Sequence, residues 1–141
     1  MSDFAGPVFP HRHVPLEWRG GPRMAGALEL AAPLALGQRG LIVAPHRTGA
    51  STVLRWIGGA VHAELPDARI EAILIDQPVE DVLDWREELP VAILHGTTTD
   101  AAGPEEHAAV REPFERAAEA AEAGMDVVLL VDSLAALARA L

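Results

Sequence analysis

The sequence predicts an α/β fold in which a mainly parallel sheet is covered by helices on both faces. Short apolar runs alternate with longer segments whose apolar residues recur at helical spacing. The apolar runs are nearly continuous, which is typical of strands buried on both faces of a parallel sheet. The chain has 141 residues, of which 50% are hydrophobic, and this is enough for one compact domain with its own core.

The amino-terminal part has less regular patterning. Residues 1–27 are rich in proline, glycine and arginine without a clear period, so we expect an extended arm that packs on the body or on a partner. The domain proper is then residues 28–141. Residues 28–37, mostly leucine and alanine, predict a short helical turn ended by Gly37. The apolar run Gly40–Val43 predicts the first strand.

From residue 51 onward, helices and strands are predicted to alternate. The predicted strands are Ile70–Ile75, Val91–Leu94 and Asp126–Val131. The predicted helices are Ser51–Ala63, Pro78–Glu88, a segment that follows the polar loop Thr97–Pro104 and runs to Ala123, and Ser133–Leu141. Proline suits the first turn of a helix and glycine suits the position after its end, as at Pro78 and Gly124. Pro113 lies inside its helix and predicts an interruption there.

Charge and composition exclude several classes of function. The net charge is −10, and residues 61–141 carry five arginines against eighteen acids, so RNA binding is not expected. Residues 1–60 carry six arginines against three acids and could bind an anion or an acidic partner. The chain has no cysteine, no signal sequence at its start and no apolar run near the roughly 20 residues that span a bilayer. We therefore expect a cytoplasmic protein with no membrane segment.

One segment resembles a phosphate-binding loop that has lost its lysine. In the motif G-x-x-x-x-G-K-[ST], Gly49 and Ser51 occupy the second glycine and the hydroxyl position. Ala44 stands at the first glycine and Ala50 at the lysine, and all eleven basic residues of the chain are arginine. The lysine contacts the outer phosphates and stabilises the transition state. The architecture of such a site is therefore predicted to persist without its catalysis.

Three sequence blocks, taken with their order and spacing, identify a related family. They are Leu30–Pro33 with Gly37–Pro45, Leu74–Val82, and Asp126–Leu134 with Leu137–Ala140. Together they resemble the ATPase core of the bacterial transcription termination factor Rho, over roughly residues 28–141. The resemblance implies a three-layer RecA-like P-loop fold with a mainly parallel sheet, truncated after the Walker B strand.

The resemblance also implies where a nucleotide would bind. The nucleotide-binding residues would be Pro45, His46, Arg47, Thr48, Gly49, Ala50, Ser51 and Thr52. Magnesium would be held by Ser51 and by Asp132, which matches the Walker B carboxylate. Gln77 falls on the glutamate that polarises the attacking water in this family. An amide can hold a water but cannot accept its proton, so Ala50 and Gln77 are both degenerate catalytic positions.

Parts of the family pattern have no counterpart in the sequence. These are the RNA-binding domain, the central-pore RNA loops, the arginine finger, and the strand that lies between the Walker A and Walker B strands. Either those two strands pair directly, or a strand from another chain fills the slot. Unpaired edges and an uncovered apolar face favour oligomerisation, so we expect a homodimer or a larger assembly.

Three functional hypotheses follow. The leading one is a Rho-like ATP-binding-type domain that does not hydrolyse ATP and acts by binding itself, Rho or another product of its operon. The second is a nucleotide-binding switch or slow NTPase that binds ATP or ADP with Mg and uses Arg47 in place of the lysine. The third is a structural remnant with no ligand.

Two other groups of polar residues carry weaker signals. His11 and His13 flank an arginine, but divalent metal sites need three or four ligands, so no metal is expected there. Acidic residues crowd the predicted helix Pro78–Glu88, and on an amphipathic helix they most simply form a solvated face.

Overall fold

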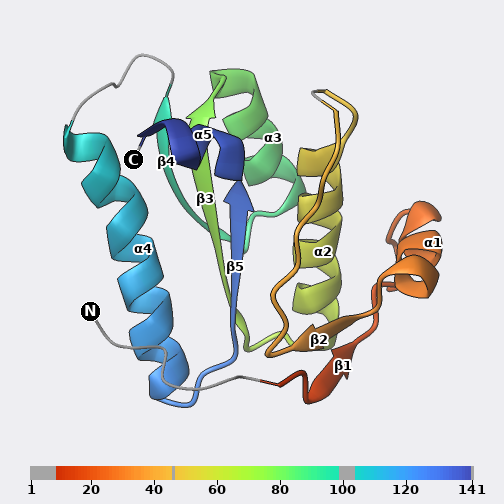
Figure 1. Ribbon diagram of the computed structural model, residues 1–141. Helices are drawn as coiled ribbons and strands as arrows, with labels where there is room; N and C mark the ends of the chain where they lie inside the picture. The colour runs from red at the N-terminus through yellow and green to blue at the C-terminus, as the bar shows by residue number, and fades with distance from the viewer. Residues whose placement is uncertain (1–8, 46, 99–103, 141) are drawn as a thin grey trace.

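The structure, a computed structural model, describes residues 9–45, 47–98 and 104–140 (Figure 1). Its elements in chain order are β1 (Arg12–Val14), α1 (Met24–Ala31), β2 (Leu34–Leu36), α2 (Ala50–Glu64), β3 (Arg69–Gln77), α3 (Val79–Glu88), β4 (Ile93–Thr98), α4 (Pro104–Glu122), β5 (Val127–Asp132) and α5 (Leu134–Ala140). None of the described helices is long and apolar enough to cross a membrane.

The main sheet has three parallel strands in the order β4-β3-β5. In this register Ile73 of β3 lies opposite His95 of β4 on one side and Val131 of β5 on the other. Helices α2 and α3 lie on one face of the sheet, and α4 and α5 lie on the other (Figure 1). This three-layer arrangement confirms the predicted α/β fold with a parallel sheet, and it is consistent with a RecA-like fold.

The larger core lies between the sheet and the α2–α3 layer. Ile70, Ala72 and Leu74 alternate onto this face of β3 and are fully or almost fully buried. They pack with Val61 of α2 and with Trp85 of α3, whose side chain is completely buried. A strand that must supply buried side chains to both faces reads as a continuous apolar run, which explains why β3 was predictable.

The other face of the sheet has a smaller core. Ile73 and Ile75 of β3 pack there with Ala136 of α5. The buried residues that α4 contributes are mostly small, namely Ala117, Ala118 and Ala120. Glu71 also points to this face and is fully buried, so the apolar run of β3 contains one charged residue inside the protein.

The segment predicted as an extended arm carries regular structure. β1 lies within it and pairs antiparallel with β2, with His13 opposite Ala35. Val14 and Leu16 are buried, so this segment contributes to the core. The predicted helical turn over residues 28–37 is wrong in its bounds, because α1 begins at Met24 and the chain then forms β2. A strand of three residues is too short to show a period in the sequence. Its pairing is not visible there either, because the partner strand lies about twenty residues away in the chain.

The predicted strand Gly40–Val43 does not form. Residues 38–45 have no regular secondary structure, and within the described part of the chain β5 pairs only with β3. The Walker A segment therefore does not pair directly with the Walker B strand. A strand is stable only when its backbone groups find partners in a neighbouring strand, and these residues have none. Leu41 and Val43 are consequently 68% and 86% exposed.

The remaining differences concern the ends of elements and one proline. β4 begins at Ile93, two residues after the predicted start at Val91, and it continues into the segment predicted as a polar loop. α4 runs through Pro113 without the predicted interruption, and the proline ring is fully buried. Burial of the ring offsets the loss of one backbone hydrogen bond. Gly124, with φ +86°, follows the helix as expected.

Replacing Trp85 with alanine should lower the free energy of unfolding by about 3–5 kcal/mol, because it leaves a large cavity between α3 and β3. Leu83, on the same helix but 55% exposed, is the matched control, and Leu83→Ala should change stability by about 0.5 kcal/mol or less. Urea unfolding measures both. Equal losses in the two variants would contradict the packing described for Trp85.

Glu29 should make the arm sensitive to acid. Its carboxylate accepts the backbone N–H of Leu16 at 2.6 Å and contacts His13 Nε2 at 2.6 Å. The Leu16 hydrogen bond is the main reason that the pKa of Glu29 is lowered from 4.5 in the folded protein. A lowered folded-state pKa adds stability above pH 4.5, and this stability is lost as the pH falls below that value.

Urea unfolding across this pH range tests the role of Glu29. The wild type should be more stable than Glu29→Gln at neutral pH, and the difference should shrink in acid. Glu64→Gln, which removes one exposed carboxylate at the end of α2, controls for the change in net charge. A difference that is independent of pH would contradict the role of Glu29.

Candidate functional site

The amino terminus of α2 offers free backbone donors. Gly49 precedes the helix with φ +98°, and no side chain caps the helix at this end. The first intrahelical hydrogen bond runs from Val53 N to Gly49 O at 3.0 Å. The amides of the first turn before Val53 have no acceptor within the helix, and the helix dipole makes this end attractive to an anion.

The loop before α2 is held by a local hydrogen bond. Thr48 Oγ1 donates to the carbonyl oxygen of Pro45 at 2.6 Å. Arg47 has φ +60°, a left-handed conformation that is uncommon for a residue with a side chain. Pro45, Arg47 and Thr48 are exposed, whereas Ser51 and Thr52 are half-buried in the first turn of α2. His46, also predicted to bind nucleotide, lies outside the described residues.

Asp132 ends β5 with a buried carboxylate. The residue is 6% exposed, and its Oδ2 atom has no hydrogen-bond partner in the structure. A buried carboxylate oxygen without a partner costs free energy unless a cation or a donor approaches it. The carboxyl ends of parallel strands lie at the same edge of the sheet as the start of α2 (Figure 1). Carboxylate and hydroxyl oxygens are ligand types that suit Mg²⁺, and the assignment of Asp132 and Ser51 as a pair of ligands stays a prediction.

Gln77 makes contacts that differ from those of a water-polarising group. Its Nε2 donates to the carbonyl oxygen of Ile75 at 3.2 Å and to that of Asp132 at 3.3 Å. The amide therefore ties the end of β3 to the end of β5. The family resemblance indicated the position of Gln77, but its partner on β5 is 55 residues away and no sequence pattern indicates the contact.

The chemical character of this edge follows from the groups that the structure places there. The described residues combine uncapped helix amides with the carboxylate of Asp132. The methyl group of Ala50 carries no charge to stabilise a transition state. The Gln77 amide cannot act as a general base.

The other candidate groups from the sequence form ordinary surface contacts. His13 pairs with Glu29, and His11 contacts the carbonyl oxygen of Phe9. In the described ranges, no three His, Asp or Glu side chains lie together in a way that could hold a metal ion. The acidic residues of α3 are mostly exposed, and Glu88 pairs with Arg55 at 2.8 Å.

Comparison with known proteins gives a consistent relationship. No protein-family model matches the chain. Transcription termination factor Rho of Streptomyces coelicolor is 37% identical over 134 residues, which is 95% of this chain and 32% of that protein. Rho of Bacillus subtilis is 35% identical over 135 residues, or 95% and 31% of the two chains. Rho of Akkermansia muciniphila is 37% identical over 142 residues, or 98% and 30%.

The chain is a Rho-like domain. It spans about a third of the length of these relatives, and the similarity extends over almost the whole of it. The Rho-like domain therefore includes the loop before α2 and the carboxyl end of β5, which form the candidate site described above. The nucleotide-binding and magnesium residues stay predictions for this domain.

Restoring the missing lysine should test whether the loop still cradles phosphates. Ala50→Lys should raise the affinity for ATP with Mg²⁺ by about tenfold or more, equivalent to about 1.4 kcal/mol, because it adds a cation beside the free amides. Ala63→Lys adds the same charge near the other end of α2, where Ala63 is exposed, and serves as the matched control. Calorimetry measures both affinities. An equal gain in the two variants, or none in either, would contradict the loop as a phosphate site.

Proposed function

We propose that this Rho-like domain does not hydrolyse ATP and acts by associating with a second polypeptide, in the first place another copy of itself. Two observations carry the proposal: the apolar residues Leu41, Ile42 and Val43 are exposed. In addition, the described part of the chain leaves one edge of β5 unpaired. We call these three residues together with the open edge of β5 the association surface.

The loss of catalysis rests on two positions. Ala50 replaces the lysine and Gln77 replaces the glutamate of the family pattern. Removal of one preorganised charge-stabilising group can lower a rate by roughly 10²–10³, and here two such groups are replaced. The hydrogen bonds of Gln77 to two carbonyl oxygens also support a structural role for this side chain.

The association surface lacks the features that usually prevent pairing of sheet edges. β5 reads Val-Val-Leu-Leu-Val before its first charged residue, Asp132. Proteins normally protect such edges with charges, prolines or short strands. The exposed residues Leu41, Ile42 and Val43 belong to the coil between β2 and α2 (Figure 1). An edge of this kind gains both hydrogen bonds and apolar burial when another chain covers it.

A second copy is the partner that these features favour most simply. A two-fold interface uses the same surface on both subunits, so one unpaired edge can complete another. The second partner to test is Rho, because the related proteins carry that name.

A nucleotide-binding switch is the second candidate function. It is favoured by the unpartnered Oδ2 of Asp132 and by the uncapped start of α2. In this alternative, Arg47 supplies the positive charge that Ala50 lacks, and ATP or ADP binds with Mg²⁺. Calorimetry with Mg-ATP should then give saturable binding that Arg47→Ala abolishes, and unchanged binding in that variant would remove the role of Arg47. Absence of any heat and of thermal stabilisation would favour a structural remnant.

Sedimentation velocity tests the association. The wild type should form a dimer or larger species at micromolar concentration, and the double variant Leu41→Ser/Val43→Ser should shift the population toward monomer. Leu83→Ser is the matched control, because Leu83 is 55% exposed on α3 and belongs neither to residues 41–43 nor to β5. A wild-type monomer that also fails to bind purified Rho would overturn the proposal.

A further inference from the structure

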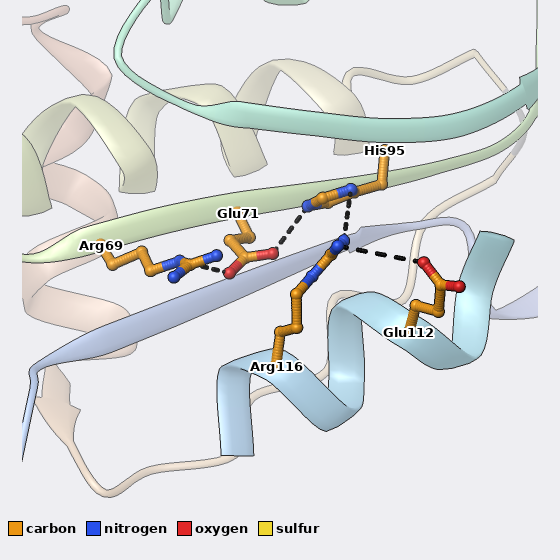
Figure 2. A network of polar contacts seen from close by, with 5 residues as sticks. All are labelled: Arg69, Glu71, His95, Glu112 and Arg116. Carbon is orange, nitrogen blue, oxygen red and sulfur yellow. Dashed lines mark hydrogen bonds and ion pairs between the residues drawn. The ribbon is translucent and has the colours of Figure 1, made fainter. Parts of the chain in front are cut away.

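Five polar side chains form a continuous set of contacts on the sheet face that α4 covers (Figure 2). They are Arg69 and Glu71 on β3, His95 on β4, and Glu112 and Arg116 on α4. We call this set the β3–β4–α4 network. None of its members belongs to the candidate nucleotide site, and the proposed association does not use them.

Glu71 is the buried centre of the network. It is 0% exposed, and Arg69 Nε lies 2.5 Å from its Oε1 as an ion pair rather than a well-aligned hydrogen bond. His95 Nε2 lies 2.6 Å from the other carboxylate oxygen. A buried carboxylate requires a compensating charge, and the arginine supplies it at every physiological pH. His95 therefore does not have to be charged to balance Glu71.

The contacts of His95 select one tautomer of its ring. Arg116 Nη2 lies 3.4 Å from His95 Nδ1, and a guanidinium can only donate. Nδ1 must therefore accept, and the ring proton must be on Nε2, which donates to Glu71. A neutral ring in this form satisfies both neighbours. Addition of a second proton would set an N–H of a charged ring against the guanidinium of Arg116.

The contact to Arg116 matters because the buried side chains between residues 111 and 122 of α4 are small or compact. Over residues 111–122, where burial is described, the buried residues are Pro113, Ala117, Ala118 and Ala120. An alanine methyl group buries little apolar area, so a polar contact to the sheet is a substantial share of what fixes the helix. Among the described side chains, Arg116 also pairs with Glu112 on α4 itself, at 3.9 Å, and this contact adds nothing between helix and sheet.

We propose that His95 is a proton-operated link between the sheet and α4, which holds Arg116 when the ring is neutral and releases it when the ring is protonated. From β3, the charged groups facing the ring are Glu71 and Arg69, and from α4 they are Arg116 and Glu112. The residue directly opposite His95 on β3, Ile73, is apolar. When acidification protonates the ring, the charged His95 binds Glu71 more tightly and repels the guanidinium of Arg116. The helix α4 then separates from the sheet more often, which we call opening.

Ring-nitrogen NMR of the wild type tests the first step. At pH 8 the Nε2 of His95 should carry the proton, and Nδ1 should be an acceptor whose resonance moves in Arg116→Gln. Arg111→Gln is the matched control. Arg111 lies on the same helix and pairs there with Glu115 at 3.1 Å, and it is not a member of the β3–β4–α4 network. A proton on Nδ1, or a charged ring at pH 8, would overturn the proposal without requiring any variant to fold.

Hydrogen exchange of α4 amides tests the release. After correction for intrinsic exchange rates, opening around Arg116 should increase by about two- to tenfold between pH 8 and pH 5 in the wild type and in Arg111→Gln, the range expected for one hydrogen bond. In Arg116→Gln the opening should already be raised at pH 8. His95→Gln retains one donor and one acceptor but cannot gain a proton there, so its opening should not depend on pH. An equal pH dependence in all four proteins would refute the link.

Discussion

The structure depends on β3, a strand buried on both faces and paired on both edges. Its residues 70–75 are all inaccessible to solvent or nearly so, and they meet two cores, one against α2 and α3 and the other against α4 and α5. At the end of this strand, the Gln77 amide donates a hydrogen bond to the carbonyl oxygen of Asp132 on β5. Near its start, the strand carries the fully buried Glu71. The candidate nucleotide site and the β3–β4–α4 network are therefore positioned by one element, at different points along its length.

A contrast with β3 explains the proposed function. β5 is paired with β3 on one edge only within the described residues, and the apolar segment that the sequence predicts as a neighbouring strand remains coil. Burial and backbone pairing stabilise a strand together, and neither is available to Leu41, Ile42 and Val43 in this chain alone. A domain with degenerate catalytic positions and an incomplete sheet is more readily explained by association than by hydrolysis. Its similarity to Rho covers about a third of those proteins, and the proposal concerns this part.

Local patterns in the sequence predicted much of the fold but not its pairings. α2, β3, α3 and β5 were placed within about two residues, because their periodicity is contained in consecutive residues. β1 and β2 were missed because two three-residue strands stabilise each other across a long separation. At the candidate site, the positions of Ala50, Gln77 and Asp132 followed from motif spacing and resemblance. The orphaned oxygen of Asp132, the partners of Gln77 and the pairing of Glu71 with His95 depend on tertiary contacts that no local pattern encodes.

The central claim is that the open edge of β5 and the segment Leu41–Val43 form an interface between chains. Hydrogen exchange at increasing protein concentration tests it most directly, because it reports the amides of the interface one by one. The account predicts that protection of Leu41–Val43 and of the β5 amides facing the open edge rises with concentration, while exposed amides elsewhere stay unchanged. Fast exchange of both segments at every concentration, or protection that rises only at other surfaces, would contradict it.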